Sequence, residues 1–92
     1  MIEILSSIFY VSQWVLDTGS TSHICNHMQG LKLSRRLAKG EVDIKVGNGA
    51  LVSAKAVGTY SLLLPSGHSL DLNNCYFVPS ISKNIISVSL LD

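Results

Sequence analysis

The chain has 92 residues, of which 47% are hydrophobic and 14% are charged, and its formal net charge is +1 at pH 7. This composition excludes a disordered tail, and the near-neutral charge gives no electrostatic basis for direct binding of nucleic acid. The apolar N-terminal stretch contains Glu3 and several polar residues, so neither a membrane-spanning helix nor an export signal is predicted. The length predicts one small domain over residues 1–92, to which a partner subunit would add useful buried surface.

The first two predicted segments are a strand and a loop. Residues 8–16 are rich in β-branched and aromatic side chains and predict a strand, while residues 1–13 as a whole match no specific pattern. Residues 20–39 are polar and have poor apolar periodicity, which predicts a loop with a helical turn around residues 33–38. Arg35 and Arg36 are expected to face solvent on this loop.

A β-hairpin is predicted in the middle of the chain. Residues 42–46 alternate between apolar and polar side chains, which is the period of a half-buried strand. Gly47, Asn48 and Gly49 tolerate the positive φ angles of a tight turn, and residues 50–57 return as the second strand.

Short strands also fill the second half of the chain. They are predicted at residues 59–64, 69–72 and 75–78, with breaks at Pro65-Ser66-Gly67, Asn73-Asn74 and Pro79, and residues 85–91 are predicted to be the last strand or a strand-helix junction. Many short strands separated by Gly, Pro and Asn predict an all-β barrel or sandwich.

The two cysteines, Cys25 and Cys75, are predicted to be small buried thiols, because two cysteines make no disulfide framework. Free thiols are typical of a reducing compartment, so a cytoplasmic location is expected. Three possible zinc ligands stand at alternate positions, His23, Cys25 and His27, and on a strand such residues would share one face. A fourth ligand and the usual loop spacing are missing, so the sequence predicts neither a metal nor another cofactor.

The most informative motif is Asp17-Thr18-Gly19, which follows the apolar residues 14–16. A strand that delivers an aspartate into a tight turn can place its carboxylate in a cleft, and Gly19 allows both the turn and the close approach of another chain. Peptide hydrolysis by carboxylates needs two acids that share one proton. This chain offers one acid in such a setting, so a catalytic Asp17 requires a two-fold dimer. The other aspartates are expected to face solvent: Asp43, Asp71 and Asp92.

Two blocks of sequence extend this motif. The first is Trp14-Val15-Leu16-Asp17-Thr18-Gly19-Ser20-Thr21-Ser22-His23, and the second is Tyr76-Phe77-Val78-Pro79 followed by Lys83-Asn84-Ile85-Ile86-Ser87-Val88. They resemble the W-x-x-D-S-G-A-S-x-H signature and the Y-V-P…K-N-L-L-S-V ending of the protease region in copia-type retrotransposon polyproteins. The first block differs from its signature at Thr18 and Ser20. The blocks have the order and spacing of that family, and the resemblance covers residues 14–91.

The resemblance implies a small closed β-barrel of the retropepsin type and an aspartic endopeptidase that cuts its own polyprotein as a homodimer. Asp17 would supply the catalytic acid, Thr18 would brace the two active-site loops, and Gly19 would leave room for substrate and water. The hairpin tip would be a flap that pairs with an extended peptide, formed by Val46, Gly47, Asn48, Gly49 and Ala50. The residues implied to support the aspartate loop are Trp14, Ile85, Ile86 and Ser87.

The resemblance also implies that the chain is part of a longer Gag-Pol polyprotein. Retropepsins build much of their dimer interface from a segment that follows the second block, and only a few residues follow that block here. Two functions therefore stay open at this stage. One is an active endopeptidase, and the other is a non-catalytic β-barrel domain with a structural role, in which Asp17-Thr18-Gly19 is simply a turn.

Overall fold

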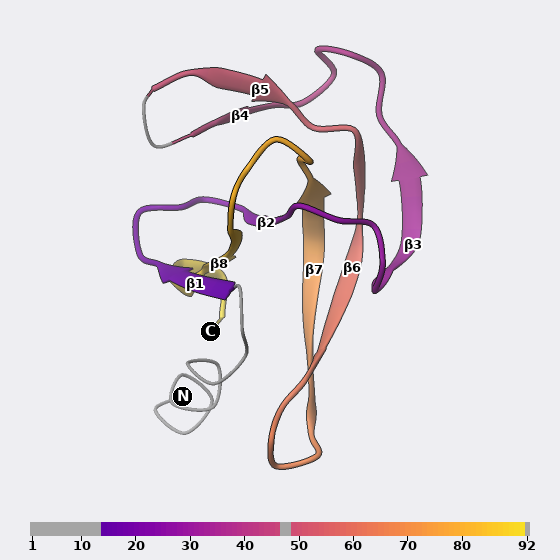
Figure 1. Cartoon of the computed structure of the whole chain (residues 1–92), viewed down its shortest axis with the longest axis vertical. Coiled ribbons are helices and arrows are strands. Elements are labelled where there is room, and N and C mark those ends of the chain that lie inside the picture. Colours follow the sequence, from indigo (N-terminus) through magenta and orange to yellow (C-terminus); the bar gives the residue numbers. More distant parts are fainter. Residues whose placement is uncertain (1–13, 47–48, 92) are drawn as a thin grey trace.

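The computed structural model describes residues 14–46 and 49–91, and within these ranges the chain is all-β (Figure 1). The strands are β1 (Trp14–Asp17), β2 (His23–Cys25), β3 (Leu31–Arg36), β4 (Asp43–Lys45), β5 (Leu51–Ser53), β6 (Ala56–Leu63), β7 (Ser69–Phe77) and β8 (Asn84–Ser87). A 3-10 turn, η1 (Val88–Leu90), follows β8. The predicted all-β class is confirmed. No helix in the described ranges is long and apolar enough to cross a membrane.

The main sheet has six strands in the order β1-β8-β2-β7-β6-β3, and β4 pairs with β5 in a separate two-stranded sheet. β1 runs parallel to β8 and β2 runs parallel to β7, whereas β6 is antiparallel to both β3 and β7. Among the described strands β1 and β3 are the two edges of this sheet. Closure of the predicted barrel is therefore not confirmed.

Apolar side chains form two cores, because adjacent residues of a strand point to opposite faces of its sheet. On β2, Cys25 belongs to one cluster and Ile24 to the other. The central core consists of Cys25, Leu62, Leu64, Leu72, Cys75 and Ile86. The hairpin core consists of Ile24, Leu37, Ala54 and Val78, with Val42, Ile44 and Val52 packed against it. The hairpin core thus fixes the β4–β5 hairpin to the main sheet.

The predicted hairpin is confirmed, with a shorter second strand. β4 and β5 are antiparallel and in register from Asp43 opposite Ser53 to Lys45 opposite Leu51. Gly49 has a φ of 86°, as the turn requires, while Gly47 and Asn48 lie outside the described residues. The predicted strand over residues 50–57 is instead two strands. Its break follows from buried Ala54 and from Lys55, whose N–H donates to the carbonyl of Phe77 (2.9 Å) and so turns the chain towards the main sheet.

The long β6–β7 hairpin turns at the predicted Pro65-Ser66-Gly67, and Leu64 N–H donates to the carbonyl of His68 across it (2.8 Å). The predicted break at Asn73-Asn74 is wrong, because β7 continues through both residues. They form a bulge in which two residues of β7 oppose one residue of β6, between the pairs Gly58–Cys75 and Tyr60–Leu72. Asn74 takes a φ of 54°, which asparagine tolerates better than most residues. The two asparagines therefore mark a local irregularity of the backbone, but it is a bulge within β7 and not a turn between two strands.

The predicted loop over residues 20–39 is wrong, because it contains β2 and β3. All three residues of β2 are buried, so this strand shows no alternation of apolar and polar side chains. β3 is an edge strand that is exposed along nearly its whole length, and the predicted helical turn at residues 33–38 is replaced by strand and a following connection. β3 is a strand because it pairs with β6, and no local sequence pattern predicts that pairing.

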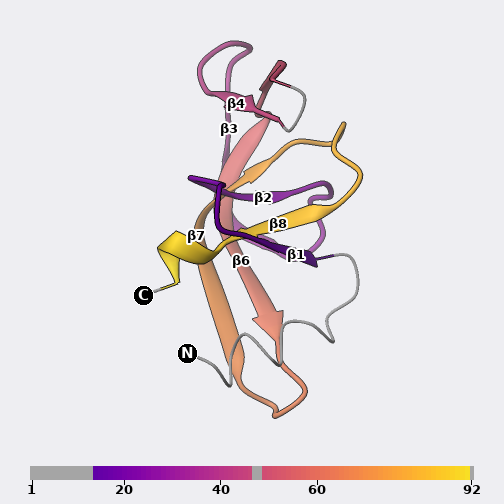
Figure 2. The same ribbon diagram turned by 90° about the vertical axis from the view of Figure 1, so that its left-hand side faces the viewer.

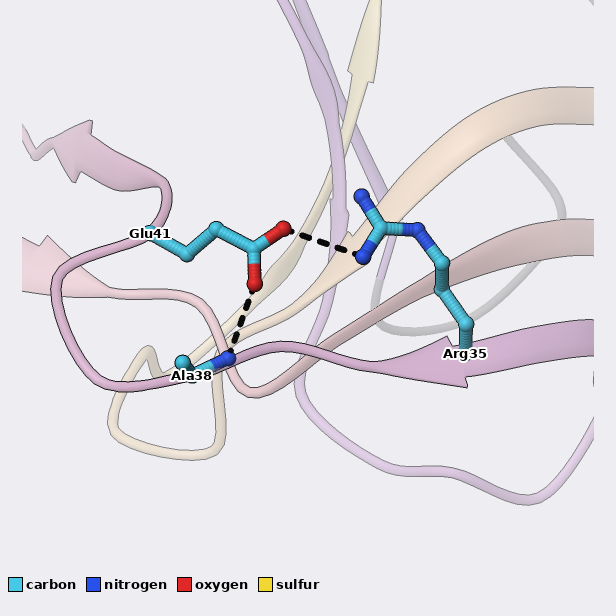
Figure 3. A network of polar contacts seen from close by, with 3 residues as sticks. All are labelled: Arg35, Ala38 and Glu41. Atoms are coloured by element: carbon cyan, nitrogen blue, oxygen red, sulfur yellow. Dashed lines mark hydrogen bonds and ion pairs between the residues drawn. The ribbon is translucent and has the colours of Figure 1, made fainter.

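Glu41 organises the connection between β3 and β4 (Figure 3). One of its carboxylate oxygens accepts the N–H of Ala38 (3.0 Å), and the other pairs with the guanidinium of Arg35 (3.0 Å). These hydrogen bonds, that from Ala38 first, lower the pKa of Glu41. Arg35 and Arg36 face solvent as predicted, although they lie on β3 and not on a loop.

The strand or strand-helix junction predicted over residues 85–91 is a junction in the structure, with β8 followed directly by η1. β8 ends at Ser87, and the chain then turns into η1, closed by the N–H of Leu91 on the carbonyl of Val88 (3.2 Å). β8 lies between β1 and β2 in the sheet, so it is buried at three of its four residues. This position places the second sequence block directly beside the first.

Candidate active site

A cleft of about 1030 Å³ separates the loop after β1 from the β4–β5 hairpin. Figure 2 shows the hairpin at one end of the molecule, with β1, β2 and β8 crossing the middle. Ile24, Tyr76 and Ile85 line the cleft from the main sheet. The loop after β1 contributes Asp17 and Gly19, and the hairpin side is mainly aliphatic: Val42, Ile44, Val46, Leu51 and Val52.

Asp17 is the last residue of β1 and is half-buried in this cleft, opposite Ser87 of β8. Its Oδ1 accepts the N–H of Gly19 at 2.7 Å, which fixes the carboxylate within its own turn. A Cβ added to Gly19 would lie 3.3 Å from the same oxygen, so glycine keeps this approach open. Thr18 and Gly19 are both exposed, and Gly19 lines the cleft whereas Thr18 does not. Asp17 therefore lines a solvent-accessible cleft, and its second carboxylate oxygen accepts no hydrogen bond from the described residues.

Hydrogen bonds from Ser87 connect β8 to the loop that follows Asp17. The Ser87 hydroxyl donates to the carbonyl of Ser20 (2.6 Å), and the Ser87 N–H donates to Nδ1 of His23 (3.0 Å). Ser20 in turn donates its hydroxyl to the carbonyl of Ser22 (2.7 Å). His23 and Ser87 are 3% and 0% exposed, so these bonds are shielded from water. Residues more than 60 positions apart therefore hold the aspartate loop in one shape.

Replacing Ser87 with alanine should destabilise the chain by roughly 1–2 kcal/mol, because the carbonyl of Ser20 loses a shielded donor. Urea unfolding followed by circular dichroism measures this change. Ser89→Ala is the matched control, since Ser89 is exposed and its hydroxyl contacts the Ser87 hydroxyl (3.0 Å). The control should change stability by less than about 0.5 kcal/mol. Equal effects of the two substitutions would contradict the assigned role of Ser87.

His23 must be neutral to accept the Ser87 N–H at Nδ1, so its proton lies on Nε2. Burial lowers the pKa of His23 below its ordinary value of about 6.5. Below about pH 6.5, His23 therefore binds a proton more readily in the unfolded chain than in the folded chain. This contribution to stability is complete above about pH 6.5 and is lost as the pH falls towards the lowered pKa, with a slope of at most about 1.4 kcal/mol per pH unit.

Unfolding in urea at pH 7.5, 6.0 and 5.0 should accordingly show a loss of stability in acid. His23→Asn keeps an acceptor at the δ position that does not titrate in this range, and it should flatten the loss. All other titrating groups are common to both chains, so the difference between the two curves isolates His23. Parallel curves would show that His23 does not carry this pH dependence.

The predicted flap residues that the structure describes are Val46, Gly49 and Ala50, at the tip of the β4–β5 hairpin. Val46 and Gly49 line the cleft, and the Val46 N–H donates to the carbonyl of Ala50 (2.9 Å). Gly49 N–H donates to the carbonyl of Val46 (2.8 Å), which closes the tip. Gly47 and Asn48 lie outside the described residues. Val46 and Gly49 therefore face the same cleft as Asp17, whereas Ala50 does not line it.

The predicted supporting residues divide between the two cores. Ile86 is fully buried in the central core, against which Trp14 packs, while Ile85 packs on the hairpin core and lines the cleft. Trp14 also makes an edge-to-face contact with Tyr60, with ring centroids 5.0 Å apart. Contacts with the central core thus anchor β1 and β8 on one face of the sheet, while Ile85 lines the cleft on the other face.

Sequence reasoning missed several residues that shape the site. Asn84 is 1% exposed, and its Oδ1 accepts the N–H of Asn26 (2.8 Å). Asp43 lines the cleft, although its carboxylate accepts the Ser53 hydroxyl on the hairpin (2.9 Å). Lys45 and Lys83 also line it. No local signal could have found the role of Asn84, because its partner Asn26 is 58 positions away, whereas Asp43 and Lys45 lie on the predicted hairpin.

His27 takes part in a hydrogen-bond chain on the side of the sheet near Trp14. Asn26 donates its amide to the carbonyl of Ile81 (3.2 Å), so its Oδ1 accepts Nδ1–H of His27 (2.9 Å). Nε2 of His27 then accepts the hydroxyl of Tyr60 (2.9 Å), whose pKa is raised chiefly by burial. Both ring nitrogens of His27 are therefore occupied by protein groups.

Cys25 and Cys75 are free and fully buried in the central core, which confirms the prediction of small buried thiols. They lie on the neighbouring parallel strands β2 and β7. The pKa of Cys75 is raised, mainly by its hydrogen bond with Cys25 and also by burial, so this group stays a thiol.

Comparisons with known proteins agree on one family. The chain matches the family described as "Pol polyprotein, beta-barrel domain" over residues 14–92. It is similar to two proteins of Arabidopsis thaliana, "Retrovirus-related Pol polyprotein from transposon RE2" at 34% identity and its RE1 counterpart at 36%. Each match covers 84 residues, which are 91% of this chain and 6% of the relative. The chain therefore spans a small part of either relative. No solved structure matches it.

Proposed function

The chain belongs to the family of Pol polyprotein β-barrel domains from copia-type retrotransposons, and on this premise we propose that it is a retropepsin-like aspartic endopeptidase. Its substrate is the polyprotein of the same element, and it acts as a homodimer in which each copy gives one aspartate. We further propose that formation of the dimer completes a closed barrel of the retropepsin type. The observation that carries it is the position of Asp17, half-buried at the end of β1 in a cleft that the β4–β5 hairpin overlooks.

The chemistry follows from a pair of Asp17 carboxylates placed across a two-fold axis. Two carboxylates within hydrogen-bond reach cannot both ionise at low cost, so the pair holds one proton. The ionised member takes a proton from water, which attacks the scissile carbonyl, while the protonated member donates to the carbonyl oxygen. The Gly19 N–H on Oδ1 keeps the carboxylate oriented and leaves its other oxygen for this work.

The cleft suits an extended peptide with apolar side chains. Its hairpin wall is mainly aliphatic and its floor includes Ile24, Tyr76 and Ile85. An extended chain can also pair its backbone with an exposed hairpin, as a flap requires. Hairpin closure over the substrate would exclude water from the reacting bond.

Analytical ultracentrifugation combined with a cleavage assay tests this proposal. The chain is compared with a longer form that includes the natural downstream sequence of its polyprotein, using an internally quenched peptide library with apolar residues at the central positions. Cleavage is expected only at concentrations where a dimer sediments. A strictly monomeric protein that cleaves, or a stable dimer of the longer form that cleaves nothing, would overturn the proposal; the second outcome would favour the non-catalytic structural role.

A further inference from the structure

A second depression lies on the main sheet and shares no lining residue with the Asp17 cleft. Arg36, Ala56 and Phe77 are in register across β3, β6 and β7. Side chains in register lie on the same face of a sheet, so the small Ala56 leaves a notch between its two larger neighbours. The depression has a volume of about 540 Å³, and Met28, Leu37 and Lys55 are among the residues that complete it.

The floor of this depression is preformed. The N–H of Leu37 donates to the carbonyl of Lys55 (2.9 Å), and the N–H of Lys55 donates to the carbonyl of Phe77 (2.9 Å). These two bonds join the ends of β3 and β7 through the segment that precedes β6. Leu37 and Ala56 are 7% and 4% exposed, so the floor is packed from below. A ligand would therefore meet a fixed surface.

The rim of the depression carries positive charge without a compensating acid. Arg36 and Lys55 are exposed there, and no aspartate or glutamate lines it. The ion pair among the described residues is formed by the neighbouring Arg35 with Glu41, which leaves Arg36 without an acidic partner in that part of the chain. Met28, 42% exposed, and the half-buried Phe77 supply the apolar surface. The combination fits an apolar side chain flanked by carboxylates.

β3 adds a second recognition element, because it is an edge of the main sheet and has no partner on its outer side among the described strands. An extended peptide can add to such an edge through its backbone while alternate side chains reach pockets on one face. We propose that the β3 edge and this depression form a docking site for an extended polypeptide segment with a large apolar residue and Asp or Glu two positions away, so that both side chains lie on the same face of the segment. A free strand edge selects peptide backbone, and the chain's net charge of +1 gives little attraction for nucleic acid.

The site can be tested by NMR titration of the ¹⁵N-labelled chain with the acetylated heptapeptide TEVFVET, whose Phe and two Glu side chains share one face when it is extended. The chain carries Asp17→Asn, so that cleavage cannot interfere and the result does not depend on the proposed protease activity. Shifts are expected at the amides of Ser34, Arg36 and Lys55. Arg36→Gln should weaken binding by roughly three- to tenfold, since one charge-assisted contact is lost. Arg35→Gln, which removes the neighbouring arginine on the same strand, should change the affinity by less than about twofold.

Several results would overturn the docking site. One is equal binding of TKVFVKT, in which both acids are replaced by lysine. Others are shifts confined to Gly19 and Gly49 of the Asp17 cleft, or equal losses from the two arginine substitutions. Tighter binding of a ten-residue oligouridine at the same amides would assign the site to nucleic acid instead, and concentration-dependent shifts there without peptide would assign it to self-association.

Discussion

Asp17→Asn should abolish peptide hydrolysis, lowering kcat/KM by at least about a thousandfold, while the fold stays intact. Asparagine has the same shape and keeps an oxygen that can accept the Gly19 N–H, so the turn after β1 should persist. It cannot ionise, and a dimer of this variant therefore has no base to activate water. Initial rates on the quenched peptide library, together with urea unfolding of both proteins, measure the two effects. Stability should change by less than about 0.5 kcal/mol.

Asp43→Asn is the matched control for this substitution. Asp43 lines the same cleft, but its carboxylate is bonded to the Ser53 hydroxyl on the hairpin. The control should keep kcat/KM within about threefold of the unmodified chain, because a hydrogen-bond acceptor towards Ser53 remains. Comparable losses of kcat/KM from both substitutions would contradict the assignment of Asp17 as the catalytic acid.

Gly58→Ala should destabilise the chain by about 3 kcal/mol, the largest loss of stability expected here from a single added methyl group. A Cβ at this position would lie 2.6 Å from the carbonyl oxygen of Lys32 and 3.0 Å from Cα of Ser34. Both contacts are with the backbone of β3, which cannot move aside as a flexible side chain can. β3 approaches closely because it bulges opposite Gly58, between the pairs Lys32–Thr59 and Arg35–Val57.

Urea unfolding of the Gly58 variant should therefore show a clearly lower midpoint with an unchanged slope. Leu33→Asn is a control within the same bulge. Leu33 is 93% exposed and has a φ of 52°, a conformation that asparagine adopts more readily than leucine. It should be neutral or slightly stabilising. A loss below about 1 kcal/mol for Gly58→Ala would mean that β3 does not approach β6 as closely as described.

The parts of the fold that sequence predicts are those with local signals. The β4–β5 hairpin has alternating side chains and Gly49 in its turn, and the β6–β7 hairpin has Pro65 to Gly67. β2 and β3 had no such signal. β2 is buried at every residue and β3 is nearly all exposed, so neither alternates, and both owe their strand character to distant partners. Propensity and period cannot report such pairing.

The candidate site divides in the same way. Asp17 and Gly19 were found because a turn motif is read from adjacent residues, and their hydrogen bond lies within that turn. The hydrogen bonds of Ser87 to Ser20 and His23 join residues 67 and 64 positions apart, so no window of sequence contains them. The docking depression likewise requires three strands in register around Ala56. Its existence depends on topology alone.

One active site should take an Asp17 from each of two copies of the chain, and subunit mixing tests this most directly. The unmodified chain and Asp17→Asn, in the longest form that dimerises, are unfolded together, refolded at fixed total concentration and assayed. If both aspartates are needed, the rate follows the square of the unmodified fraction, so an equal mixture gives about one quarter of the full rate. A rate proportional to that fraction, about one half for the equal mixture, would show that each copy acts alone and would contradict the shared site.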